Sequence, residues 1–219
     1  MPDAGSLLVA ALTIMTVGVL LWFAFGTQNN IKRGNLLLAW IQTGLPAIGQ
    51  RTKLKWLGTS VVQLDISEPT RPFREAQVMI VLEPRDIGLL WMVSRRRGRR
   101  DFIIVRTRLQ SSPQFEFEAG DVRRWTGSDR LSRLDADAWQ RSAWRDGAVQ
   151  IAHTPRAKVD DMRALWDELE SLTGGVWRLS VRRDSPHLEA HFAPPADRAS
   201  AADVFAALKR IANTAMAKR

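Results

Sequence analysis

The chain has 219 residues, of which 45% are hydrophobic and 25% charged, with 14 glycines and 10 prolines. This balance is typical of a globular protein and excludes disordered and collagen-like classes. The absence of cysteine excludes disulfides, thiol nucleophiles and Cys-ligated zinc or iron–sulfur centres, and the absence of tyrosine excludes a phenolic catalyst. The net charge of +9 is carried mainly by arginine and predicts anionic partners.

An uncharged segment, Leu7–Phe25, lies close to the N-terminus. At about 1.5 Å per residue it matches the ~30 Å hydrocarbon core of a bilayer, which predicts a transmembrane helix with Trp22 at the headgroup level. The alternative is a cleaved signal peptide, because residues 24–26 include small side chains suited to cleavage. The leader contains no Lys or Arg and carries Asp3, which favours the anchor.

The basic residues near this helix predict its orientation. None precedes it, whereas Lys32 and Arg33 follow it closely. Because the positive side of a span stays in the cytoplasm, residues 1–6 are expected to be a short extracytoplasmic tail and residues 31–219 cytoplasmic. The expected location is the cell membrane.

The excess charge is not spread evenly along the chain. Residues 1–30 carry −1, residues 31–110 carry +9 (15 basic against 6 acidic) and residues 111–219 carry +1 (17 against 16). Basicity next to a span favours contact with the anionic cytoplasmic leaflet, where each Lys or Arg contributes on the order of 1 kcal/mol. Part of this excess is the ordinary positive-inside bias.

The juxtamembrane segment, residues 26–51, contains a predicted short amphipathic helix. Asn35 is a suitable N-cap, Gly44 stands where a glycine often ends a helix, and Pro46 follows. The helix is largely apolar and includes Trp40, so it is expected either to lie in the membrane interface or to pack under the soluble domain. The sequence leaves both alternatives open.

The segment Asp86–Asp101 joins an apolar run to a cluster of five arginines. An apolar wedge beside a polybasic cluster is typical of a peripheral surface that binds anionic lipid. The predicted contacts with the membrane or another anionic partner are Lys32, Arg33, Trp40, Leu89, Trp91, Arg95, Arg96, Arg97, Arg99 and Arg100.

Two other interpretations of this segment stay open. In the first, Asp86 caps a short helix whose Ile87, Leu90 and Trp91 are buried, and the arginines form a solvated loop that turns at Gly98. In the second, the arginines bind the phosphates of a nucleic acid.

The remaining chain, residues 52–219, is expected to form one soluble domain of typical size. Its first part, residues 52–125, is rich in predicted strands, at 62–66, 76–82, 103–109 and 115–118, with a turn at 119–121. A polar bridge, residues 126–147, is expected to be partly helical from Ser132.

In that bridge Trp139 and Trp144 alternate with Arg141 and Arg145. This pattern predicts either a stacking platform for single-stranded nucleic acid or tryptophan rings that cover the edge of the core, and the second is favoured.

Residues 148–219 predict the order β-α-β-β-α. One helix is expected to open at Thr154 and Pro155, and the last to begin at Ser200. The predicted fold class is α+β: an N-terminal transmembrane helix, then a cytoplasmic two-layer domain with helices on one face of a mostly antiparallel sheet.

One group of side chains resembles metal ligands. His187, Glu189 and His191 alternate along a predicted strand and share its outward face. Arg178 and Arg182 are expected on the facing strand, where they would repel a cation and pair with Glu189. We therefore assign no metal, cofactor or catalytic residue.

These features favour a non-enzymatic protein whose cytoplasmic domain binds another protein, or assembles with itself, at the anionic membrane surface. The alternatives are a membrane-tethered nucleic-acid binder and a membrane-anchored enzyme without a recognisable motif.

Overall fold

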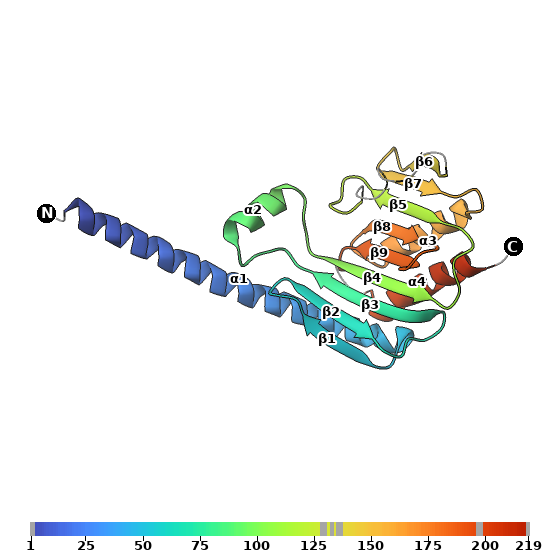
Figure 1. Ribbon diagram of the computed structural model, residues 1–219, viewed down its shortest axis with the longest axis horizontal. Coiled ribbons are helices and arrows are strands. Elements are labelled where there is room, and N and C mark those ends of the chain that lie inside the picture. The colour runs from blue at the N-terminus through green and yellow to red at the C-terminus, as the bar shows by residue number, and fades with distance from the viewer. Residues whose placement is uncertain (1–2, 128–130, 132–133, 135–137, 196–198, 218–219) are drawn as a thin grey trace.

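The computed structural model describes residues 3–127, 131, 134, 138–195 and 199–217. Within these residues the chain forms four helices and one nine-stranded antiparallel sheet (Figure 1). The helices are α1 (Ala4–Ile48), α2 (Gly88–Arg96), α3 (Val159–Ser171) and α4 (Ala201–Met216). The strands are β1 (Thr52–Trp56), β2 (Val61–Ile66), β3 (Phe73–Val81), β4 (Phe102–Leu109), β5 (Phe117–Asp121), β6 (Gln140–Trp144), β7 (Val149–His153), β8 (Val176–Val181) and β9 (Leu188–Phe192). They lie in the order β1-β2-β3-β4-β9-β8-β5-β7-β6.

Helix α1 runs without a break from the exposed N-terminal segment into the domain. The separate helix predicted between Asn35 and Gly44 is therefore wrong, because these residues belong to α1, which begins at Ala4 with Asp3 as its N-cap. Gly44 does not end the helix. A Cβ there would lie 2.5 Å from the carbonyl carbon of Ala201, so this glycine allows α1 to pack directly on the start of α4.

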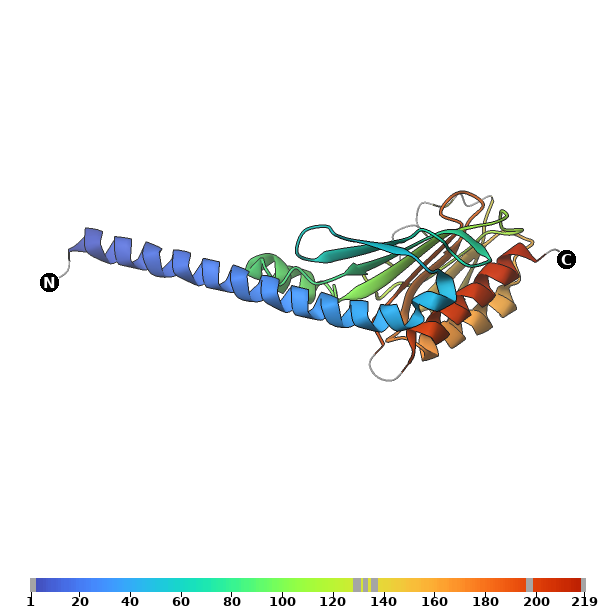
Figure 2. The same ribbon diagram turned by 90° about the horizontal axis from the view of Figure 1, so that it is seen from below.

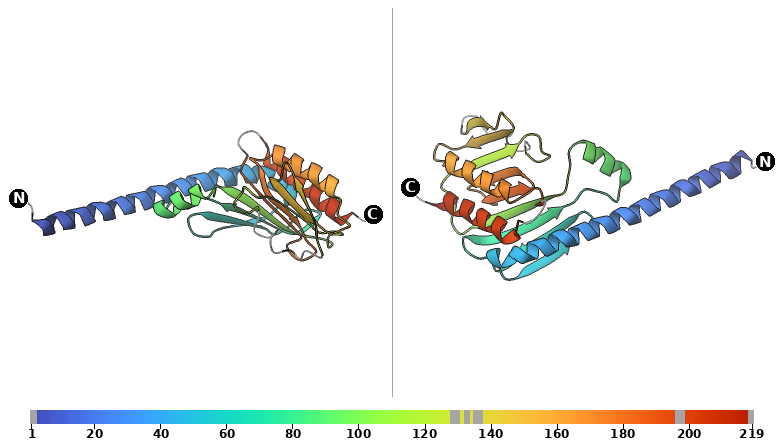
Figure 3. Two further views of the ribbon diagram at one scale, coloured as in Figure 1. Left: turned by 90° about the horizontal axis from the view of Figure 1, so that it is seen from above. Right: turned by 180° about the vertical axis from the view of Figure 1, so that it is seen from behind.

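Only the C-terminal part of α1 contributes to the core. Leu37, Leu38, Ile41 and Ile48 are buried, so this part packs under the domain, one of the two expected alternatives. The N-terminal part extends away from the domain in every view (Figures 1 and 3), and its most apolar 18-residue window has a mean hydropathy of 2.4 with none of it buried. By length and composition this helix could cross a membrane.

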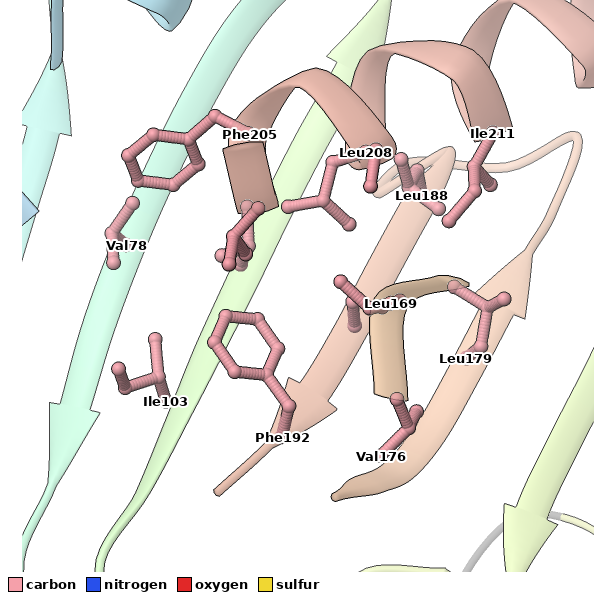
Figure 4. Close-up of a cluster of buried hydrophobic side chains, with 14 of the residues drawn as sticks. Val78, Ile103, Leu169, Val176, Leu179, Leu188, Phe192, Phe205, Leu208 and Ile211 are labelled. Carbon is pink, nitrogen blue, oxygen red and sulfur yellow. The ribbon is translucent and has the colours of Figure 1, made fainter. Parts of the chain in front are cut away.

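Three helices cover one face of the sheet, as the two-layer prediction requires. The C-terminal part of α1, α3 and α4 lie together on that face (Figure 2). Phe205, Leu208 and Ile211 of α4 point toward the strands, where they meet apolar side chains that include Val78 and Phe192 (Figure 4). Ser200 accepts hydrogen bonds from the backbone N–H groups of residues 202 and 203, which confirms the predicted start of α4.

The strands predicted at 62–66, 76–82 and 103–109 correspond to β2, β3 and β4, whereas the one predicted at 115–118 begins only at Phe117, in β5. Val62, Leu64 and Ile66 are buried in alternation along β2, and β3 and β4 pair over most of their lengths. The turn predicted at 119–121 is wrong, since these residues belong to β5 and are buried between β7 and β8.

Two element starts in the second half also differ from expectation. Thr154 and Pro155 form a turn before α3, which begins at Val159. The start of the helix expected from Ser132 lies outside the residues that the structure describes. The later part of the same predicted segment, residues 140–144, forms strand β6. Arg145, Asp146 and Gly147 then turn the chain with φ values of 52°, 54° and 84°. Asp-Gly is a hairpin signal that favours β6–β7 pairing over a helix.

Candidate membrane-facing site

Helix α2 lies beside the exposed part of α1 (Figure 1), where Trp91 of α2 meets Trp22 of α1. The rings of Trp22 and Trp91 have their centroids 6.1 Å apart, and the Trp22 indole Nε1 donates a hydrogen bond to the Arg85 carbonyl at 3.0 Å. Gly26 makes this approach possible, because a Cβ at that position would lie 2.2 Å from the Arg85 carbonyl oxygen. The loop that enters α2 is therefore in backbone contact with α1.

The apolar side chains of α2 face solvent. Leu89 is 74% exposed and Ile87 52% exposed, and Leu90, Met92 and Val93 are exposed as well. The interpretation of this helix as buried core is therefore wrong for Ile87 and Leu90, while Trp91 is half-buried against Trp22. Asp86 does not cap the helix either, because its carboxylate accepts a hydrogen bond from Thr59 Oγ1.

A cluster of buried charges holds α2 in place. Asp101 receives two hydrogen bonds from Arg85, at 2.9 and 3.0 Å, and lies 3.4 Å from Arg33 of α1. Glu83 is buried and accepts hydrogen bonds from the Trp91 indole and from Arg95. The carboxylates of Asp101 and Glu83 are buried while Arg33 and Arg95 are partly exposed, so removal of these arginines would leave buried carboxylates with fewer partners.

The five clustered arginines are not equivalent. Arg95 is paired with Glu83 and stacks on Trp91, and Arg100 donates to backbone carbonyls of the same loop. Arg99 lies over the ring of Trp125, 5.9 Å from its centroid. Arg96 and Arg97 are exposed and form no ion pair with any residue that the structure describes. These two are the cations most available to an anionic partner.

The other predicted contact residues lie farther along α1. Lys32 is exposed and Arg33 is half-exposed beside Asp101. Trp40 is half-buried, and its indole Nε1 donates to the Ala199 carbonyl at 2.8 Å, so it packs against the start of α4. The structure brings all the predicted contact residues except Trp40 to the region where α1 leaves the domain.

An apolar hollow of about 520 Å³ separates α1 from the start of α2. Its lining includes Met15, Val19 and Phe23 from α1, Leu89 from α2, and Ile87, which directly precedes α2. All of these side chains belong to the apolar segment of α1 or to the apolar run at α2. The walls of the hollow therefore form one continuous apolar surface that extends over both helices.

Trp125 is a residue that sequence reasoning missed. It is 41% exposed, and Val122 is 38% exposed in the same short loop after β5. Its local signal was available: Val122-Arg123-Arg124-Trp125 repeats, in four residues, the apolar and basic combination of the wedge.

A second cluster of charges lies on the sheet face away from the helices. His187, Glu189 and His191 share the face away from the helices, as predicted, but other parts of the chain cover them and they are buried. Thr126 bonds to His191 and Trp139 lies against Arg182, so these two residues help to cover this face.

The pairing across β8 and β9 is close to the prediction. Arg178 lies opposite His191 and donates to Glu189 at 2.9 Å, whereas Arg182 donates to Glu118 of β5 and not to Glu189. Glu118 is also bound by Arg178 and by Ser180. The two carboxylates share Arg178, and each also contacts a further arginine, Arg182 for Glu118 and Arg106 for Glu189, so their charge is compensated and attracts a metal cation little. Among the described residues, no group of three His, Cys, Asp or Glu side chains is placed to hold a metal.

The ionisation of this cluster follows from burial and charge. Burial by itself raises the pKa of Glu189, but its hydrogen bond with His191 and the charges of Arg178 and Arg106 lower that pKa to about 2. Burial lowers the pKa of His191. The hydrogen bond with Glu189 and the charge of that carboxylate act in the opposite direction, but together with the two arginines burial keeps the pKa below its usual value. The ring is therefore neutral at pH 7, with Nε2–H donating to Glu189 and Nδ1 accepting from the Thr126 hydroxyl.

A row of hydroxyl, imidazole and carboxylate also occurs in hydrolases, where the hydroxyl is the nucleophile. Here Thr126 is only 8% exposed, and the carboxylate of Glu189 is neutralised by two arginines. We assign the row a structural role.

Trp139 and Trp144, in the segment predicted to be a polar bridge, are covered by arginine side chains of the same chain. Arg182 lies 4.4 Å from the centroid of the buried Trp139 ring, and Arg145 lies 4.7 Å from that of Trp144. Arg145 is itself paired with Asp167 and Glu170 of α3. The interpretation as rings at the edge of the core therefore describes Trp139 better than a stacking platform.

The sheet face over β2 to β4 is not covered in the same way. It has a hollow of about 330 Å³ whose lining includes Asp65, Glu75, Gln77, Arg106 and Arg108. The acids of this hollow are already bonded, Asp65 by two glutamines and Glu75 by Arg108. The surface therefore combines both charges with little free charge.

Neither a protein-family model nor a curated protein matches this sequence.

Proposed function

We propose that the chain is a single-pass membrane protein of non-enzymatic type, with its N-terminus outside the cell and its α+β domain in the cytoplasm. The domain mediates protein interaction or self-assembly at the anionic membrane surface. The observation that supports this most strongly is the position of α2: its exposed apolar side chains lie beside the exposed apolar part of α1, and arginines follow at once.

This arrangement matches the layers of a bilayer. The apolar part of α1 and the wedge of α2 together form an uncovered apolar surface, which soluble proteins rarely expose at this size. Trp22 and Trp91 lie at its edge, where indole rings favour the interface. Arg96 and Arg97 follow the apolar side chains of α2 in the chain, and each would gain on the order of 1 kcal/mol next to lipid phosphates.

A permanent anchor also agrees better with the packing than a cleaved signal does. Residues 24–26 lie within a continuous helix, and Gly26 is buried against Arg85. The same helix continues to Ile41 and Ile48 in the core, so the apolar segment and the domain share one rigid element.

The open sheet face is the surface we assign to a protein partner. Its hollow carries paired acids and arginines, which suits the polar and mixed character of a non-obligate protein interface. The nucleic-acid alternative loses its second predicted contact, since the rings of Trp139 and Trp144 are covered by Arg182 and Arg145.

The orientation can be tested with single cysteines, because the natural chain has none. We expect Ser6→Cys to react with a membrane-impermeant maleimide in intact cells, and Ser111→Cys to react only after the membrane is opened. Both side chains are exposed, so accessibility reports the side of the membrane. Labelling of Ser111→Cys in intact cells would contradict the cytoplasmic location, and release of the chain by alkaline carbonate would contradict the anchor.

The interaction surface can be tested by replacing Gln77 with a photo-crosslinking amino acid in the full chain. We expect illumination of native membranes to give a discrete crosslinked product, either with a second copy or with another protein. Gln140 on β6, at the opposite edge of the sheet, is the matched control. Equal products from both positions, or none from Gln77, would contradict the assignment of this face.

A further inference from the structure

The loop after β5 lies at the same end of the sheet as α2. Four register pairs carry this alignment across the sheet: Val81 with Phe102, Ile103 with Phe192, Val176 with Phe192, and Arg178 with Gly120. The end of β5 is therefore level with the start of β4, which follows directly from α2 and its arginines. The contact between Arg99 and Trp125 closes the distance between the two loops.

The apolar side chains of this loop are held outward by its own hydrogen bonds. Asp121 accepts from the backbone N–H of Arg123 at 3.0 Å and from its guanidinium at 2.9 Å. The Val122 N–H bonds to the Ala148 carbonyl, and the Gly127 N–H to the Arg124 carbonyl. With the backbone so fixed, the exposure of Val122 and Trp125 belongs to the folded state.

We propose that Val122 and Trp125 are a second point at which the domain enters an anionic bilayer, next to the wedge of α2. This inference rests on the proposed membrane anchoring and adds a contact to it. The chemistry that supports it is the combination of two exposed apolar side chains with arginines of the same end of the sheet: Arg99 lies over Trp125, Arg124 belongs to the loop, and the exposed Arg96 and Arg97 precede Arg99 in the chain. Tryptophan favours the headgroup region, and the arginines complement phosphate.

A second contact has a geometric consequence. A domain held by α1 alone can rotate about the helix axis, whereas additional lipid contacts at α2 and at the β5 loop oppose this rotation. The other end of the sheet then lies farther from the bilayer, and the open face of β2 to β4 stays free for a partner.

The test uses the full chain reconstituted in vesicles, with one cysteine at a time carrying the environment-sensitive fluorophore bimane. Val122→Cys is the test position, Leu89→Cys on α2 reports the wedge, and Ser111→Cys at the other end of the sheet is the control. We expect a blue shift and several-fold stronger quenching by acyl-brominated lipid at positions 122 and 89 than at 111. The shift at 122 should be larger with phosphatidylserine than with phosphatidylcholine alone.

The outcomes separate this inference from the proposed function. A lipid signal at position 89 without one at 122 would overturn the second contact and leave the anchoring of α2 intact. Emission typical of water at positions 89 and 122 would overturn the second contact and also the contact of α2 with lipid. A shift at 122 on addition of single-stranded oligonucleotide, but not with anionic vesicles, would assign the loop to nucleic acid and overturn the lipid contact. Near-ultraviolet circular dichroism checks that each variant is folded.

Discussion

Replacement of Arg178 by methionine is expected to lower the free energy of unfolding by about 3–5 kcal/mol. Arg178 is 4% exposed and is the cation that Glu118 and Glu189 share. Methionine fills a similar space but leaves two buried carboxylates with one less positive charge between them. Urea unfolding of the full chain in detergent micelles, followed by tryptophan fluorescence, measures the loss.

Two further variants make this prediction specific. Arg156 is an exposed arginine, so Arg156→Met should leave the free energy of unfolding unchanged to within about 0.5 kcal/mol. Adding Glu118→Gln to Arg178→Met should recover part of the loss, because it removes one of the uncompensated charges. A loss no greater than that of Arg156→Met would show that the cluster contributes nothing to stability.

Replacement of Gly44 by valine is expected to have a similarly large effect, about 3 kcal/mol, at the upper end of the range for overpacking. A Cβ at this position meets backbone atoms of residues 201 and 202 at 2.5–2.6 Å, and backbone cannot move aside as a side chain can. Helix α1 must then separate from the start of α4, which exposes Ile41 and its buried neighbours. Urea unfolding and limited proteolysis both report this separation.

Gly18 provides the matched control within the same helix. A Cβ there has nothing within 4 Å, so Gly18→Val should leave stability and protease resistance unchanged. Equal behaviour of the two variants would contradict the close packing of α1 on α4.

The rigid connection of anchor and domain matters for the proposed function. Because one helix carries both the apolar segment and part of the core, the position of the domain relative to the bilayer follows from contacts between α1 and the rest of the chain. The partner surface on β2 to β4 is then presented in a defined orientation and not on a flexible tether.

The structure also shows why part of the site was beyond sequence reasoning. Asn35 and Gly44 have the local signature of a short helix, but the tertiary contact at Ala201 overrides it. Likewise, the apolar run of α2 has the composition of a core helix. In the structure α2 packs through Trp91 against Trp22, away from the core, and its other apolar side chains stay exposed. Local propensity is a weak prior wherever packing between distant segments decides the outcome.

The sequence by itself determined the features that depend on neighbouring residues: the apolar segment of α1, the charge that follows it, and the alternation that makes β2 to β4 strands. Tertiary structure alone decided which segments meet. Trp22 meets Trp91, Arg99 meets Trp125, and Arg178 meets Glu118, each pair far apart in the chain. The physical reason is that periodicity and propensity depend on neighbouring residues. These contacts join segments that are distant in the sequence, so they form only in the folded chain.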